Sequence, residues 1–169
     1  RKLLKEFLFY FIPLIILLLC IWPGFLKGDE FYILEAVRDL RFSPAQTGIT
    51  SLFYIACLRF FPSVGSITFF QVLIVSCIYA YIFYMLKQIY PSRNLLLCRL
   101  VCFLLPVLDG NLFTLRATLV GWIFLLIMIM CFYAWKKDEM SVKQWVVISL
   151  LCGLIIAWRS EYIYLLLFI

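Results

Sequence analysis

The sequence predicts an all-α fold, a polytopic bundle of transmembrane helices with a long outer first loop. Hydrophobic residues make up 66% of the 169 residues, only 14% are charged, and the mean hydropathy is +1.08. No polar stretch is long enough to form a separate soluble domain, so residues 1–169 make one transmembrane domain. Histidine is absent, which excludes imidazole-based catalysis and histidine-ligated metals within this chain.

The basic residues report membrane orientation and do not indicate a nucleic-acid partner. The net charge is +6, but the 15 basic residues are scattered between apolar runs and form no basic stripe. The chain begins at Arg1 without an initiator Met and stops inside the apolar run 162–169. We therefore expect it to be the N-terminal part of a larger membrane protein.

Apolar runs give the predicted spans. The first run, residues 7–26, holds 20 uncharged residues, enough to cross a hydrocarbon core of about 30 Å. A cleaved signal peptide is the alternative, because Arg1, Lys2 and Lys5 precede the run, but no small-residue cleavage site follows it. The later predicted spans are residues 66–86, 95–108, 117–135 and 144–158, and residues 162–169 would begin a sixth.

Residues 47–61 are the ambiguous segment, because their apolar core is short and ends at Arg59. If they lie in the interface and the N-terminus is cytoplasmic, nine basic residues fall inside and six outside. A crossing at this segment would reverse those counts. The positive-inside rule therefore favours the first topology, which leaves a net charge of +6 inside and zero outside.

The outer loop, residues 27–65, is predicted to be structured. Ile33, Ala36, Val37 and Leu40 recur at helical spacing, with charged residues between them. This pattern is typical of an amphipathic helix on the membrane surface. Pro44 would end that helix, and a second interfacial helix over 47–61 would lead into the next span.

Two adjacent carboxylates, Asp29 and Glu30, open this loop a few residues after the first span. Asp29 could cap a helix that begins near Glu30, where its negative charge would interact favourably with the positive N-terminal end of the helix dipole. The pair could also supply a general base or ligands for a divalent cation at the membrane surface. These roles are compatible, because a capping position also fixes a carboxylate in place.

Two further groups of charges are predicted on the same outer side. Asp109-Gly110-Asn111 is a turn signal, with Arg116 entering the next span. Arg159 and Glu161 lie between two apolar runs, where charges are costly and are functional candidates. A tight turn, a snorkelling arginine and a surface ion pair are the simpler interpretations. Alternatively, Arg159 could bind a phosphate and Glu161 could support it.

The seven cysteines include no CxxC pair and lie mostly inside apolar runs, so we interpret them as small packing residues. Phosphate-binding and nucleophile-elbow motifs are absent from the sequence.

In the order of these features, the chain resembles the GT-C superfamily of polytopic membrane glycosyltransferases, which use polyprenyl-phosphate sugars. The resemblance covers nearly the whole chain through short motifs. The segments that carry it are Gly-Asp-Glu-Phe at 28–31, the surface segment 47–61, residues 106–109 and residues 153–161.

The resemblance implies that Asp29 or Glu30 activates the acceptor, that Asp109 is a second acidic residue, and that Arg159 contacts the donor phosphate. Arg116 would assist at that phosphate. The implied partners are a polyprenyl-phosphate sugar donor, a glycan, lipid or protein acceptor, and membrane lipid, with no nucleic acid. The implied location is the bacterial cytoplasmic membrane, and the sequence requires no cofactor. A cell-envelope polysaccharide polymerase or ligase and a non-enzymatic transporter or scaffold are the alternatives.

Overall fold

The predicted all-α fold is confirmed by the computed structural model of the chain. It describes residues 2–26, 28–41, 48–113, 116–138 and 140–158, with the side chains of Asp29 and Arg116 outside the description. The described part contains no strand, and its one isolated bridge joins Phe25 to Phe113. The helices are α1 Lys2–Cys20, α2 Gly28–Arg38, α3 Gly48–Phe60, α4 Gly65–Ile89, α5 Leu96–Leu100, the 3-10 helix η1 Val101–Phe103, α6 Leu105–Leu112, α7 Arg116–Lys137 and α8 Val142–Trp158.

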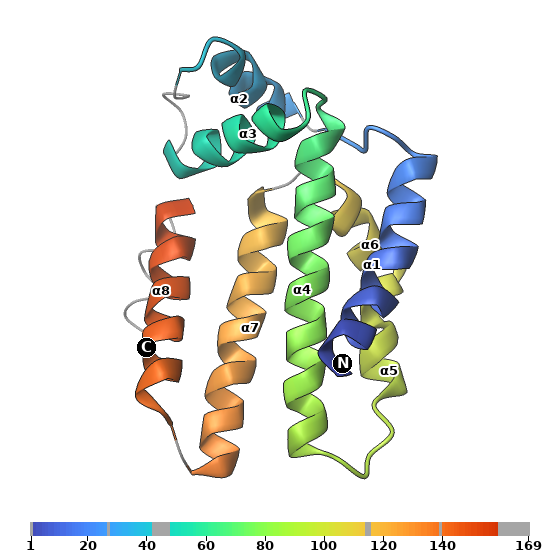
Figure 1. Ribbon diagram of the computed structural model, residues 1–169, viewed down its shortest axis with the longest axis vertical. Helices are drawn as coiled ribbons and strands as arrows, with labels where there is room; N and C mark the ends of the chain where they lie inside the picture. Colours follow the sequence, from blue (N-terminus) through green and yellow to red (C-terminus); the bar gives the residue numbers. More distant parts are fainter. Residues whose placement is uncertain (1, 27, 42–47, 114–115, 139, 159–169) are drawn as a thin grey trace.

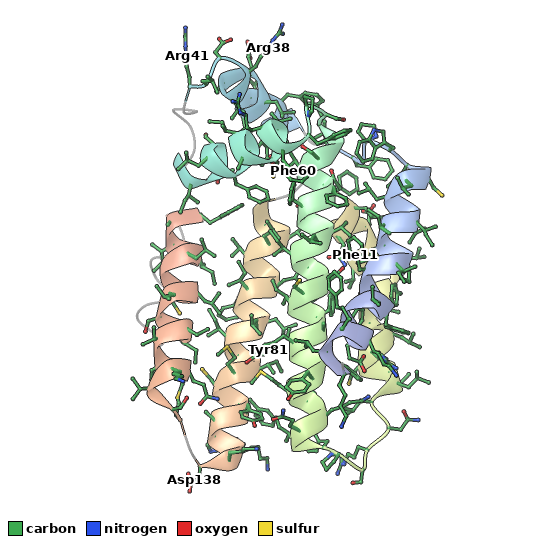
Figure 2. The ribbon with its side chains drawn as sticks, viewed as in Figure 1. Phe11, Arg38, Arg41, Phe60, Tyr81 and Asp138 are labelled. Carbon is green, nitrogen blue, oxygen red and sulfur yellow. The ribbon has the colours of Figure 1, made fainter. Side chains whose placement is uncertain are left out.

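The long helices stand along one axis, and two short helices lie across one end of them (Figure 1). Helix α1 packs on α4, α4 on α7, and α7 on α8. Helices α2 and α3 lie crosswise at the end where α1 stops and α4 begins, which we name the α2–α3 end. The opposite end, where α4 stops near Lys87 and α7 stops at Lys136 and Lys137, is named the basic end. Arg38 and Arg41 lie at the α2–α3 end, and Asp138 lies at the basic end (Figure 2).

The protein is an integral membrane protein by the length and composition of its helices. Among the described residues, α1, α4 and the part of α7 from Ala117 are long and apolar enough to span a bilayer, and α3 and α8 are shorter apolar helices. Helices α4, α7 and α8 contain the runs 66–86, 117–135 and 144–158. Helix α3, which covers most of the ambiguous segment 47–61, lies across the ends of the long helices (Figure 1).

The first helix ends earlier than the predicted span. Helix α1 stops at Cys20, whereas the apolar run continues to residue 26. Pro23 disfavours helical backbone in the residue before it, and Gly24 has φ of +94°, a conformation that suits glycine. A Cβ at Gly24 would also lie 2.9 Å from Thr68 Oγ1. The chain therefore turns back over α4 before reaching the acidic pair.

The span predicted at 95–108 is broken into α5, η1 and α6, and α6 continues to Leu112. Leu104 is extended, with φ of −63° and ψ of 139°, and Pro106 follows in the first turn of α6. Proline is well suited to a first turn and poorly suited to a helix interior, because it lacks an N–H group. Hydropathy alone could not reveal this break, since the residues on both sides are equally apolar.

The first surface helix has the predicted buried face but a different end. Ile33 and Val37 are buried in a small core with α3 and the start of α4. Helix α2 ends at Arg38, before Pro44, because Leu40 adopts a positive φ of 55° and Arg41 N donates to Ala36 O at 2.8 Å. Leu40 was expected on the buried face and is instead exposed beyond the helix.

Gly65 permits a close contact between the α1–α2 connection and α4. A Cβ at this position would lie 2.4 Å from the Trp22 ring, which is closer than atoms can pack. We expect Gly65→Ala to lower the free energy of unfolding by about 2 kcal/mol, because the ring would have to move.

Thermal unfolding in detergent provides the measurement for this prediction. Gly153→Ala in α8 is the control, because a Cβ there meets open space and should raise stability by roughly 0.5–1 kcal/mol. Equal stability changes in the two variants would contradict the packing described for Trp22.

Candidate functional site

Glu30 lies between the two surface helices. It is in the first turn of α2 and only 2% exposed, and the Tyr54 hydroxyl on α3 donates a hydrogen bond to Glu30 Oε2. A buried carboxylate with a hydroxyl donor is stabilised in place. Glu30 therefore joins α2 to α3, and its carboxylate does not face an open surface.

Asp29 and Asp109 belong to segments that the structure brings to the same end of the bundle. Helix α2 begins at Gly28, so Asp29 lies inside its first turn and not at the predicted cap. Phe25, just before α2, stacks on Phe113 with ring centroids 4.8 Å apart. Asp109 is exposed one turn before Phe113, on α6.

The end of α8 docks beneath α3. Thr50 Oγ1 donates to the carbonyl of Trp158 at 3.4 Å, and the Trp158 ring lies 5.2 Å from the Phe53 ring. Arg159 and Glu161 themselves lie outside the described residues, as does the run 162–169. The last described residue of α8 thus contacts α3, the helix whose Tyr54 binds Glu30 of α2.

A buried polar network that was not predicted from the sequence fixes the end of α6. Gln71 on α4 is 2% exposed, and its Nε2 donates to the carbonyls of Asn111 at 3.0 Å and Phe113 at 2.6 Å. Asn111 is fully buried, and its Oδ1 accepts from Trp122 Nε1 at 2.8 Å. A glutamine inside an otherwise apolar span was the available signal, because polar groups in a bilayer require internal partners.

A groove of about 310 Å³ opens beside this network, between α6 and α7. Thr118 Oγ1 donates to Gly110 O at 2.9 Å across it. Asn111 Nδ2 has no hydrogen-bond partner in the described part of the chain. Asp109 directly precedes the lining residue Gly110, and Arg116 precedes Ala117. The lining residues are Pro106, Val107, Gly110, Asn111, Ala117, Thr118, Gly121, Trp122 and Leu125.

A second charged cluster lies toward the basic end and was not anticipated. Glu6 on α1 is 7% exposed and pairs with Lys87 on α4, with Nζ and Oε1 3.3 Å apart, and with Arg99 on α5. The Arg99 guanidinium also lies 4.2 Å from the Phe9 ring centroid. The cluster joins three helices, and its charges are already paired with one another.

Cys57 lies on the buried face of α3, and burial raises the pKa of its thiol to about 12. At pH 8 only about one thiol in ten thousand would then be a thiolate, which is the form that reacts with electrophiles. We expect maleimide to leave Cys57 unmodified in the folded protein and to modify it after denaturation in SDS.

Mass spectrometry of the labelled peptides tests this prediction for Cys57. Exposed Cys98 serves as the comparison within the same chain. Rapid modification of Cys57 before denaturation would show that α3 does not pack as described.

No group of three metal-binding side chains occurs in the described part of the chain. Comparisons with protein families, curated proteins and solved structures found no match for this chain.

Proposed function

We propose that the chain is part of a membrane glycosyltransferase that moves a sugar from a polyprenyl-phosphate donor to an acceptor. The groove between α6 and α7 is the observation that carries the proposal. Its wall is mostly apolar, as a lipid chain requires, and Asp109 and Arg116 flank its lining residues in sequence. We assign the α2–α3 end to the outer face of the bacterial cytoplasmic membrane, which leaves the basic end inside.

In the proposed reaction, Asp29 takes the proton from an acceptor hydroxyl. The hydroxyl oxygen attacks the anomeric carbon, and the bond from that carbon to the phosphate oxygen breaks. The bond's electron pair leaves with the polyprenyl phosphate, and the sugar's configuration is inverted. Arg159 and Arg116 would stabilise the charge developing on the phosphate, with Glu161 supporting Arg159.

Asp29 is the better candidate for the base of the acidic pair. Glu30 already accepts from Tyr54 in a buried position, which favours a structural role. Asp109, exposed on α6, would contact the donor or the acceptor near the groove. A divalent cation at this end is not required by the proposal.

Filling the groove provides the direct test. Gly121 lines it, and a Cβ at Gly121 meets open space, so Gly121→Leu should fold normally while occupying the groove. We expect this variant to bind polyprenyl phosphate at least about tenfold more weakly in lipid nanodiscs, because a lost apolar pocket contact is worth roughly 1–3 kcal/mol.

Gly153→Leu on α8 is the matched control for this test. Its Cβ also meets open space, and it does not line the groove, so binding should stay at the wild-type level. Native mass spectrometry reports both affinities. Unchanged binding in Gly121→Leu would remove the groove from the proposal.

A transporter is the second candidate, because the broken segment α5–η1–α6 is a feature of transporter helices that surround a substrate. Such folds usually contain a pair of broken helices in corresponding positions, and the described residues contain one. The two functions differ in chemistry. A transporter would move the lipid-linked sugar intact, whereas the transferase would release free polyprenyl phosphate.

A further inference from the structure

One side of the basic end carries an excess of positive charge. The start of α1, the end of α4 and α5 meet there, and Glu6 joins them by pairing with Lys87 and Arg99 (Figure 1). Residues 2–9 and 87–100 contain one carboxylate, that of Glu6, and five cations. Residues 28–41 and 48–61, at the α2–α3 end, contain four carboxylates and three cations. The five cations are Lys2, Lys5, Lys87, Arg93 and Arg99. An anion is therefore the partner that complements this side of the molecule.

Two of these cations present N–H donors at the surface. The Lys87 side chain is 54% exposed, and its Nζ lies 3.3 Å from Glu6 Oε1, which occupies one of the three donors of the ammonium group. Lys2 is exposed and lies four residues before Glu6, on the same face of α1. The more buried Arg99 adds a third positive charge to this group. One carboxylate neutralises one of the three charges and leaves two in excess.

An apolar surface adjoins these charges. Helices α1 and α5 are neighbours through the Glu6–Arg99 pair, and both expose leucine side chains, with Leu4 on α1 59% exposed and Leu97 on α5 84% exposed. Lys87 lies in the last turn of α4, a helix long enough to cross a bilayer, which places its ammonium group at the level of lipid phosphates. Cations beside exposed leucines at this level match a phospholipid better than a soluble anion.

We propose that this surface binds an anionic glycerophospholipid, phosphatidylglycerol. We name it the α1–α4–α5 surface and define it by Lys2, Leu4, Lys87 and Leu97. Lys2 and Lys87 donate hydrogen bonds to the lipid phosphate, and an acyl chain lies along Leu4 and Leu97. The lipid thereby supplies the negative charge that Glu6 alone does not provide. The inference is independent of the proposed transferase function, because the α1–α4–α5 surface shares no residue with the groove between α6 and α7.

Native mass spectrometry of the purified protein in detergent tests the proposal. The probes are phosphatidylglycerol and phosphatidylethanolamine with identical acyl chains, titrated separately. We expect phosphatidylglycerol to bind at least about tenfold more tightly, because each cation near an anionic lipid contributes about fivefold in affinity. Lys2→Gln/Lys87→Gln should lower the affinity for phosphatidylglycerol about 25-fold, as two such contributions are lost. Its affinity for phosphatidylethanolamine should change less.

Lys136→Gln/Lys143→Gln is the matched control. It also removes two exposed cations from the basic end, but from α7 and α8. Its affinity for phosphatidylglycerol should stay within about twofold of the wild type, because exposed charges at a distance are screened by salt. Thermal unfolding without added lipid checks that both double variants are folded. The Glu6–Arg99 pair remains in each of them.

Three results would overturn the proposal. Equal binding of phosphatidylglycerol by the wild type and Lys2→Gln/Lys87→Gln would exclude these two lysines as its phosphate ligands. An equal loss in Lys136→Gln/Lys143→Gln would indicate general attraction of anionic lipid to the whole basic end. Displacement of phosphatidylglycerol by an equal concentration of glycerol phosphate would show that the headgroup alone is recognised and that the leucine surface takes no part.

Discussion

Asp29→Asn should lower sugar transfer by about 10²–10⁴-fold, because a general base contributes that much to rate and asparagine cannot accept the proton. The change preserves the size of the side chain in the first turn of α2. The measurement is the release of polyprenyl phosphate from the lipid-linked sugar pool of native membranes containing the full protein. Binding of polyprenyl phosphate should change little, since the base acts on the acceptor.

Glu35→Gln is the control for charge removal on the same helix. Glu35 is exposed on α2, so this substitution should leave sugar transfer unchanged. Glu30→Gln should mainly lower thermal stability, since Glu30 is buried against Tyr54. Wild-type release in Asp29→Asn and in the Asp29→Asn/Glu30→Gln double variant would exclude the proposed mechanism. Loss of release only with Arg159→Ala would favour a polysaccharide polymerase or ligase.

Glu6→Leu should lower the free energy of unfolding by about 3 kcal/mol, because it removes the carboxylate that pairs with both Lys87 and Arg99 among the described residues. The Glu6 side chain is 10% exposed and the Arg99 side chain 27% exposed. Arg99 would therefore stay among apolar side chains, including the Phe9 ring, without a counter-charge. Chemical unfolding in mixed micelles, followed by circular dichroism, measures the change.

Lys87→Met is the companion variant for this cluster. The Lys87 side chain is 54% exposed, and water screens much of its attraction to Glu6, so the expected cost is below about 1 kcal/mol. The ordering of the two variants is the decisive result. A larger effect from Lys87→Met than from Glu6→Leu would contradict the role given to Arg99.

The predicted helices and the observed ones differ mainly where proline and glycine act. Hydropathy located the apolar runs, because moving apolar side chains from water into protein or lipid is the dominant driving force for forming membrane helices. It did not locate the end of α1 at Cys20 or the break at Leu104, because Pro23 and Pro106 act through backbone geometry. Leu40 was also placed wrongly, because its helical spacing in the sequence does not reveal that its backbone adopts a positive φ.

The candidate site was only partly predictable. The sequence identified the acidic pair and Asp109 as unusual charges near predicted membrane boundaries. Gln71 and Asn111 were missed, because neither is charged and their partners lie about forty residues apart, Gln71 Nε2 donating to Asn111 O. Long-range pairs of this kind depend on which helices become neighbours, and one sequence does not reveal that.

The sequence by itself determined the all-α membrane fold, because long apolar segments must satisfy their backbone hydrogen bonds internally when they leave water for lipid. Tertiary structure alone decided that Glu30 is buried under Tyr54. It also decided that Glu6 pairs with two cations on other helices and that Ser66 lines an aromatic pocket. These outcomes depend on packing between helices, where burial and distance fix which polar groups find partners.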